Sequence, residues 1–466
     1  MMYQAIGSSD IQFFQSIVGS PFVLTDADLL NRYGRDETED LLYCPDAVVL
    51  PSEAGQISRI LAYCSERRIP VTPRGAGTGL SGGALPVFGG LVLSTERMNR
   101  ILFIDERNFQ VTTEPGVITE VLQETVKQKG LFYPPDPASR GSCFIGGNIA
   151  ENSGGPRAVK YGVVKDYVLN LEVVLPSGNI IWTGASVLKN ATGYNLTQLM
   201  VGSEGTLGIV TRIVLRLLPH PRHDMLMLVP FHSAAQACEA VNAIFLEGII
   251  PSAAEFMERD AARLSLQLTP SSIALDEQAE AFLLLETDGN DPELLFRDME
   301  KIHAVVQRYA VGETLLAETA DQKAALWKLR RSIGEAVRRH SVYKEEDTVV
   351  PRAELPVLLD GVKAIGRRYG FRSVCYGHAG DGNLHVNILK EQLSDAQWNE
   401  LLPRAIKEIF ELCVRLGGTI SGEHGIGWVQ KPYLSIAFNP IQMDLMKKIK
   451  HVFDPAGILN PGKIFD

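Results

Sequence analysis

The chain lacks any apolar run long enough to span a membrane, and it lacks runs of basic residues. A membrane-spanning helix needs ~20 consecutive apolar residues, and no apolar run among the 466 residues approaches that length. The net charge of −10 argues against a surface that binds nucleic acid. The first five residues contain no basic residue and no long apolar segment, so the sequence predicts no signal peptide.

Cysteines are few and contain no C-x-x-C pair. This spacing excludes a cysteine-rich iron–sulfur module within the chain and predicts a reducing compartment, hence a cytoplasmic protein. We interpret the cysteines as small buried thiols. They are Cys44, Cys64, Cys143, Cys238, Cys375 and Cys413.

A glycine-rich stretch at residues 73–83 follows a short apolar run that predicts a buried strand. Five glycines in nine residues leave backbone N–H groups free to close on an anion, and Arg74 adds a positive charge. The stretch contains a formal G-x-G-x-x-G, but Pro86 and a glycine pair follow where a Rossmann fold requires a helix. A pyrophosphate-binding loop and a plain tight turn between strands both remain open here.

Two further glycine clusters occupy residues 145–155 and 202–210. Paired glycines next to asparagine and serine offer backbone N–H groups and short polar side chains to a large polar ligand. Three such loops in one domain are hard to explain as turns alone, which favours a dinucleotide.

The sequence changes character after Pro219 and Pro221, which indicate a domain boundary. We expect two or three domains from the length. Beyond the boundary, the pattern predicts a β-α-β-β-α order that is typical of ferredoxin-like units on an antiparallel sheet, followed by one long helix. The predicted elements are strands at 225–229, 253–257 and 282–286, and helices at 234–246, 292–309 and 320–339.

Two histidines flank a predicted turn at Asp381 and Gly382, with β-type residues on each side. His378 and His385 could therefore approach one another. Two imidazoles and a carboxylate suit Zn²⁺ or another first-row divalent ion, but this spacing by itself favours structural histidines.

The glycine clusters, together with residues 159–162, resemble the flavin-binding domain of FAD enzymes of the vanillyl-alcohol oxidase type. Within that type, the chain resembles the branch that holds the flavoprotein component of glycolate oxidase, FAD-dependent D-lactate dehydrogenase and D-2-hydroxyglutarate dehydrogenase. The resemblance runs from about residue 40 to the C-terminus. It implies an α+β fold with a two-subdomain FAD-binding domain at 1–220, a ferredoxin-like antiparallel-sheet cap domain at 221–420, and a segment at 421–466 that returns to the FAD domain.

The resemblance also implies a set of residues around the flavin. Thr78 stands where relatives with a covalent flavin carry histidine, so non-covalent FAD is implied. The implied FAD-binding residues are Arg74, Gly75, Ala76, Gly77, Thr78, Gly79, Ser139, Gly146, Gly147, Asn148, Asn152, Gly155, Glu204, Gly205, Ile209 and Asn460.

The same resemblance assigns the chemistry. Arg330, three residues after Trp327, and Lys344 would bind the substrate carboxylate, and Asn387 would face the substrate. A divalent metal, Zn or Mn, would be bound by His378, His385 and Glu423, and His424 would act as the base.

The implied activity is FAD-dependent oxidation of a (R)-2-hydroxy acid to the 2-oxo acid, with hydride transfer to flavin N5. The implied acceptor of the electrons is separate: a quinone, an electron-transfer flavoprotein or an iron–sulfur subunit. Hydroxyglutarate enzymes carry threonine where this chain has Gly334, which favours D-lactate or glycolate. A flavoprotein subunit of a multi-subunit glycolate oxidase and a D-2-hydroxyglutarate dehydrogenase are the alternatives. Peripheral membrane association and a homodimer stay open.

Overall fold

The computed structural model describes residues 3–38, 41–271 and 273–465. Residue contacts divide the chain into two compact units. The first unit comprises Met1–Gly154, Val163–His220 and Glu423–Asp466, and the second comprises Gly155–Gly162 and Pro221–Gly422. The predicted boundary at residue 220 is compatible with this division. Among the described helices, none is long and apolar enough to span a membrane.

A four-stranded sheet in the first unit leads into the glycine loop. Its central strands run parallel and its edge strand β1 is antiparallel. Helices α1 (Ser8–Val18) and α3 (Ala54–Arg67) bury apolar side chains against it. The strand order is β1 (Val23–Leu24), β2 (Ala47–Val49), β4 (Leu91–Ser94) and β3 (Val71–Arg74).

A five-stranded antiparallel sheet forms the other part of the first unit. Two short helices, α4 (Thr119–Lys127) and α5 (Ile145–Glu151), lie between its strands in sequence. The strand order is β5 (Ile101–Asp105), β6 (Gln110–Thr113), β10 (Ile209–Arg216), β8 (Val168–Val174) and β9 (Ile180–Trp182).

Helix α5 corrects the prediction of a second glycine loop. Gly146 and Gly147 lie in the first turn of this helix, although each costs about 1 kcal/mol of helix propensity relative to alanine. Ile145 and Ile149 are fully buried, so tertiary packing outweighs the local preference.

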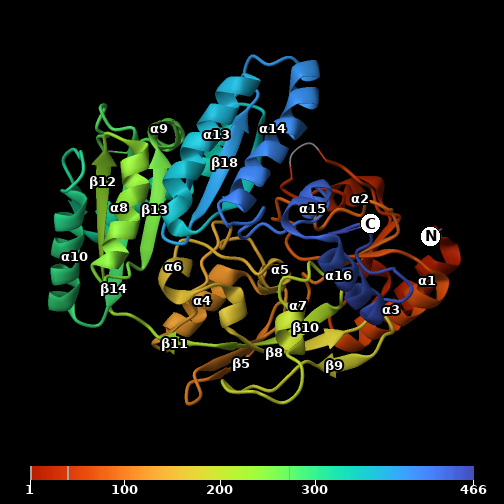
Figure 1. The fold of residues 1–466 in the computed structure, drawn as a ribbon. Coiled ribbons are helices and arrows are strands. Elements are labelled where there is room, and N and C mark those ends of the chain that lie inside the picture. The colour runs from red at the N-terminus through yellow and green to blue at the C-terminus, as the bar shows by residue number, and fades with distance from the viewer. Residues whose placement is uncertain (1–2, 39–40, 272, 466) are drawn as a thin grey trace. The chain divides into compact units, whose positions relative to one another are not determined.

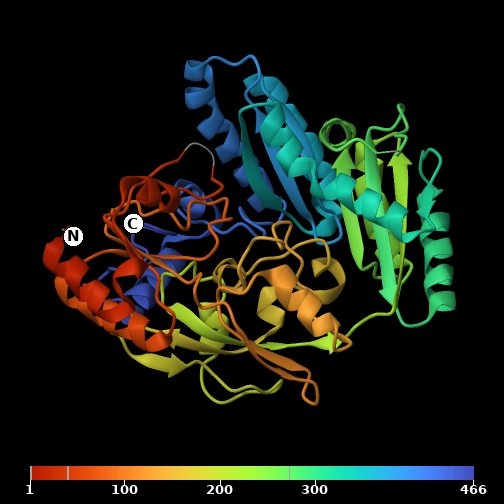
Figure 2. The same ribbon diagram turned by 180° about the vertical axis from the view of Figure 1, so that it is seen from behind.

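The second unit is built on one antiparallel sheet, which Figure 1 shows with helices α8 and α13 in front of it and Figure 2 shows from behind. One face carries α8 (Ala234–Leu246), α10 (Pro292–Val306), α13 (Leu355–Tyr369) and α14 (Asp395–Arg415). The other face carries α9 (Arg259–Leu268), α11 (Ala320–Arg331) and α12 (Ile333–His340). The strand order is β15 (Leu315–Ala317), β12 (His223–Phe231), β14 (Ala281–Gly289), β13 (Ala253–Glu258), β17 (Arg372–His378), β18 (Asn383–Leu389) and β16 (Tyr343–Val349).

The predicted β-α-β-β-α order is confirmed, with α9 added between β13 and β14. The predicted single helix over 320–339 is wrong, because α11 and α12 are separated at Ser332. Leu329 and Ile333, on either side of the break, belong to the same buried cluster. The break leaves Arg330 in the last turn of α11.

The segment Gly155–Gly162 groups with the second unit, which the sequence did not predict. Asp288 on β14 explains this, because its carboxylate accepts hydrogen bonds from Lys160 Nζ at 2.5 Å and from the Tyr161 hydroxyl at 2.8 Å.

Candidate active site

One cavity in the first unit is lined by all three glycine clusters. Its lining includes every predicted FAD-binding residue except Asn152 and Gly155. Asn152 instead ends α5 in a left-handed conformation, and its side-chain oxygen accepts the Lys165 N–H at 2.9 Å.

The glycine loop wraps the guanidinium of Arg74. An added Cβ on Gly77, whose φ is +76°, would lie 2.1 Å from Arg74 Nη2, so only glycine fits. Burial lowers the pKa of Arg74, and no described carboxylate lies within ion-pair distance of it. A buried guanidinium beside backbone N–H groups that no side chain covers suits the binding of a diphosphate. Gly79 and Gly147 leave open space where side chains would project.

The C-terminal segment closes against this cavity. Asn460 Nδ2 donates to Gly83 O at 3.0 Å and to Glu204 O at 2.8 Å, which ties the first and third glycine clusters together. Its backbone N–H donates to Val71 O on β3 at 2.7 Å.

A loop with candidate catalytic residues lines the same cavity. Glu423 and His424 are both part of the lining, and the Glu423 carboxylate lies 2.7 Å from where a Cβ on Gly154 would stand. The next residues are fixed by Glu204, whose carboxylate accepts the Ile426 N–H at 2.8 Å and the Gly427 N–H at 2.6 Å.

Two buried carboxyl groups therefore lie beneath this loop. Burial raises the pKa of Glu204 to about 6, and the two backbone N–H groups partly offset that rise. Burial and the neighbouring Glu204 raise the pKa of Glu151 well above its usual range. Glu151 Oε2 has no hydrogen-bond partner among the described residues and faces Gly425, where an added Cβ would be 2.2 Å away. Glu151 therefore favours its protonated form, whereas the Glu204 carboxylate keeps two N–H donors.

In the second unit, the turn at Asp381 brings the two predicted histidines together. His378 ends β17, and His385 lies on the adjacent strand β18. Their ring centroids are 5.3 Å apart. The expectation that these histidines approach one another is confirmed.

Glu255 on β13 connects His378 to Arg330. Its fully buried carboxylate lies 2.8 Å from His378 Nδ1 and 2.6 Å from Arg330 Nη2. The two partners keep the pKa of Glu255 below its usual range although burial raises it. Because Nδ1 faces this carboxylate, Nε2 lies on the side of the ring away from Glu255. Arg330 Nε has no hydrogen-bond partner among the described residues.

The register of β16 corrects the expected role of Lys344. Glu345 pairs with Asn387 and Asp347 pairs with His385, so these four side chains share one face of the sheet. Lys344 pairs with Ile388 and projects from the opposite face. Glu345, not Lys344, therefore shares the face with Arg330.

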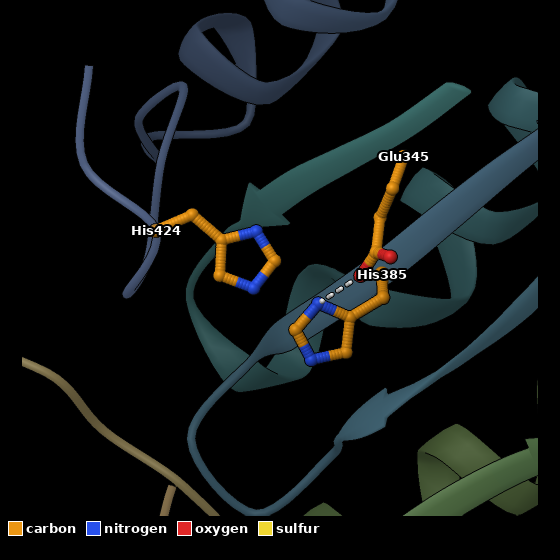
Figure 3. A group of neighbouring side chains, drawn as sticks. All are labelled: Glu345, His385 and His424. Atoms are coloured by element: carbon orange, nitrogen blue, oxygen red, sulfur yellow. Dashed lines mark ion pairs between the residues drawn. The ribbon is translucent and has the colours of Figure 1, made fainter. Parts of the chain in front are cut away.

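Figure 3 shows the ion pair between Glu345 and His385. The Glu345 Oε1 to His385 Nδ1 distance is 3.4 Å, and Asp347 Oδ1 lies 3.8 Å from the same nitrogen. Asp347 is held in turn by Asn383, Ser421 and the Gly422 N–H. His385 therefore has carboxylates on one side of its ring.

A tyrosine hydroxyl lies beside Asn387 and Gly334 on this face. Tyr376 has the Arg330 guanidinium 4.9 Å from its ring centroid, and the fully buried Asn387 lies beside its hydroxyl. An added Cβ on Gly334 would stand 3.1 Å from that hydroxyl, so a threonine here would crowd it. We call the group formed by these side chains the anchor cluster. It consists of Glu255, Arg330, Glu345, Asp347, Tyr376, His378, His385 and Asn387.

Four of these residues, Glu255, Glu345, Asp347 and Tyr376, were not predicted as site residues. A usable signal existed for Glu255, which is a lone carboxylate inside an apolar run that predicts a buried strand. The others depend on strand register, which the sequence alone does not give.

Comparison with known families identifies the class of protein. Residues 45–184 match the family described as an FAD binding domain, and residues 220–464 match the C-terminal domain of FAD linked oxidases. The fold is similar to that of p-cresol methylhydroxylase with substrate bound, with a TM-score of 0.80 at 19% identity, covering 100% of this chain and 99% of that one.

Similar individual proteins narrow the class. The chain is 44% identical over 434 residues to glycolate oxidase subunit GlcD of Bacillus subtilis (strain 168), which covers 93% of this chain and 92% of that protein. It is 38% identical over 426 residues to D-lactate dehydrogenase of Anaerostipes hadrus, which covers 90% of this chain and 89% of that protein. The chain belongs to the FAD-linked oxidases. It is a flavoprotein oxidoreductase with the fold of the vanillyl-alcohol oxidase type.

Proposed function

We propose that this protein oxidises a (R)-2-hydroxy acid of the D-lactate or glycolate type to the 2-oxo acid. The names of its relatives support this substrate class. The observation that carries the proposal is the anchor cluster, in which an arginine with an unsatisfied Nε and two histidines share one face of a buried sheet. The substrate carboxylate would pair with the guanidinium, and the adjacent hydroxyl would face the imidazoles.

FAD would be held by the cavity of the first unit, with its diphosphate at Arg74 and the glycine loop. When bound, FAD accepts the hydride that leaves C2 of the hydroxy acid. Thr78 lines the cavity and offers no imidazole for a covalent link, so we propose non-covalent binding.

Arg330 would bind the substrate carboxylate. Its guanidinium is held at one nitrogen by Glu255 and presents a fixed direction to the substrate. Asn387 and the Tyr376 hydroxyl are the neighbouring polar groups that would complete the carboxylate or hydroxyl contacts.

His378, His385 and Glu423 would bind a divalent metal, Zn or Mn. The donor set fits such an ion, because two imidazoles and a carboxylate are ligands that these metals accept. The carboxylates of the anchor cluster outnumber its one guanidinium, so a cation would also offset their charge. A metal bound there would lower the pKa of the substrate hydroxyl as a Lewis acid.

His424 would take the hydroxyl proton. An imidazole is suited to this task near neutral pH, and its loop is fixed through Glu204.

The electrons would pass to a separate acceptor. Among the described residues all six cysteines are free thiols, so none forms a redox-active disulfide. The candidate electron acceptors are a quinone, an electron-transfer flavoprotein and an iron–sulfur subunit. One relative is itself named as a subunit, which supports the second proposal, that this chain works inside a multi-subunit glycolate oxidase. Reduction of the bound flavin by substrate, measured on the isolated chain, distinguishes a chain that is active alone from one that works only inside a complex.

Metal analysis of four variants tests the roles of the histidines. We expect His378→Asn and Glu423→Gln to lose both metal and activity while FAD content stays normal. His424→Asn should keep the metal and lose roughly 10²–10⁴-fold in the rate of flavin reduction, which is the range for general base removal. His303→Asn, on the exposed side of α10, is the matched control and should change neither. Full activity in protein free of stoichiometric metal would remove the metal from the proposal.

A further inference from the structure

We propose that Glu345 rejects substrates with a second carboxylate, so that the protein is restricted to 2-hydroxy monocarboxylates. This inference rests on the proposed function, and it assigns the selection to one side chain on β16.

The position of Glu345 follows from strand register. It pairs with Asn387 across the β16–β18 ladder, and Asn387 in turn pairs with Val374 on β17. Side chains at alternate positions therefore place Glu345 on the face that carries Tyr376 and Arg330. Only 8% of the Glu345 side chain is exposed, so solvent screens its charge poorly.

The charges of the anchor cluster favour one substrate carboxylate and no more. Arg330 is its one guanidinium, and Glu255 already takes one of its nitrogens. Glu345 and Asp347 contribute two further carboxylates on β16. Lys344, the cation that could have received a second carboxylate, projects from the other face.

Two neighbouring rings connect Arg330 to Glu345. The Arg330 guanidinium lies 4.9 Å from the Tyr376 ring centroid, and the His385 ring centroid lies 5.2 Å from that of Tyr376. Glu345 Oε1 lies 3.4 Å from His385 Nδ1. A substrate with its first carboxylate on Arg330 would bring a second carboxylate toward Glu345, where like charges repel.

Substrate pairs that differ only at the far end test this inference. We would compare kcat/KM for (R)-2-hydroxybutanoate and (R)-malate, and for (R)-2-hydroxypentanoate and (R)-2-hydroxyglutarate. The wild type should favour the monocarboxylate of each pair by about 100-fold or more. Glu345→Gln should reduce that ratio about tenfold or more, and Glu345→Lys should reduce it further. Each ratio compares two substrates on one preparation of one variant. If a Glu345 substitution disturbs His385 and lowers metal content, both kcat/KM values fall together and their ratio is unchanged.

A binding measurement keeps the test decisive if a variant is inactive. The Kd values of 2-oxobutanoate and oxaloacetate, followed by the flavin spectrum of the holoenzyme, should show the same change in preference. Equal wild-type efficiency with both members of a pair would overturn the inference. So would an unchanged ratio in Glu345→Gln, or a change that appears with Lys344→Gln in its place. A wild type that oxidises none of these acids would instead overturn the proposed function.

Discussion

Arg330 shares the carboxylate of Glu255 with His378, although the three residues come from α11, β13 and β17. An arginine near the end of a charged helix is usually a solvated side chain, but this one is 5% exposed. Truncating it would leave the buried Glu255 carboxylate with His378 but without its guanidinium partner, and breaking a buried ion pair costs about 3–5 kcal/mol. A loss of activity after truncation would therefore mix binding with folding.

Replacing Arg330 with lysine separates the two effects. The charge and the ion pair with Glu255 are retained, but the planar fork is lost. We expect kcat/KM for 2-hydroxy acids to fall about tenfold or more, with normal FAD content and nearly normal thermal stability. Arg331→Lys is the matched control, since this neighbour stacks on Trp327 at 5.1 Å, and it should change kcat/KM less than twofold. Equal effects of the two substitutions would exclude Arg330 as the anchor.

Whole elements differ in how well the sequence predicts them. The β17–β18 hairpin follows from β-type residues on both sides of Asp381 and Gly382, because the local pattern and the pairing agree. Helix α5 and the break at Ser332 could not be predicted, since both depend on which side chains the core accepts. The face occupied by Lys344 also could not be predicted, because a shift of one residue reverses every side chain in a strand.

The loop after Glu423 gives a prediction at this scale. The folded-state pKa of Glu204 is raised to about 6 from its usual 4.5, so its contribution to stability is present below about pH 4.5 and is lost as pH rises through about 6. Glu204→Gln cannot ionise and should lack this decline. We expect the difference in Tm between wild type and variant to fall as pH rises from 4.5 to 6.5. Glu124→Gln, on the exposed side of α4, should show no such trend. A pH-independent difference would mean that Glu204 has the same pKa in the folded and the unfolded chain.

At the scale of the whole molecule, the order of the glycine clusters predicted the family, the fold and residues that line one cavity of the first unit. Three segments distant in sequence and the C-terminal Asn460 meet around the cavity. The sequence pattern does not show that they meet, and only the family resemblance implied it. The buried Glu151 was not predicted because its neighbours Glu204 and Gly425 are distant in sequence. The sequence signals burial of Glu255 but does not give its partners Arg330 and His378.

The cofactor should come away intact. Because Thr78 lines the cavity and carries no imidazole, acid precipitation of the purified yellow protein should release all of its FAD into the supernatant. Flavin that stays with the denatured chain would contradict non-covalent binding. Arg74→Met should lower FAD affinity because the diphosphate loses its charged partner. Arg97→Met is the matched control, since Arg97 bonds Leu50 O instead, and it should retain FAD.

The central claim is that this chain itself transfers electrons from a 2-hydroxy acid to FAD. The most direct measurement mixes the isolated holoenzyme with D-lactate, L-lactate or glycolate in the absence of oxygen and of any acceptor, and follows the oxidised flavin absorbance. We expect rapid and complete bleaching by D-lactate or glycolate, formation of one 2-oxo acid per flavin, and slow or no bleaching by L-lactate. A flavin that stays oxidised with every 2-hydroxy acid, in protein with full FAD and metal content, would contradict the central claim.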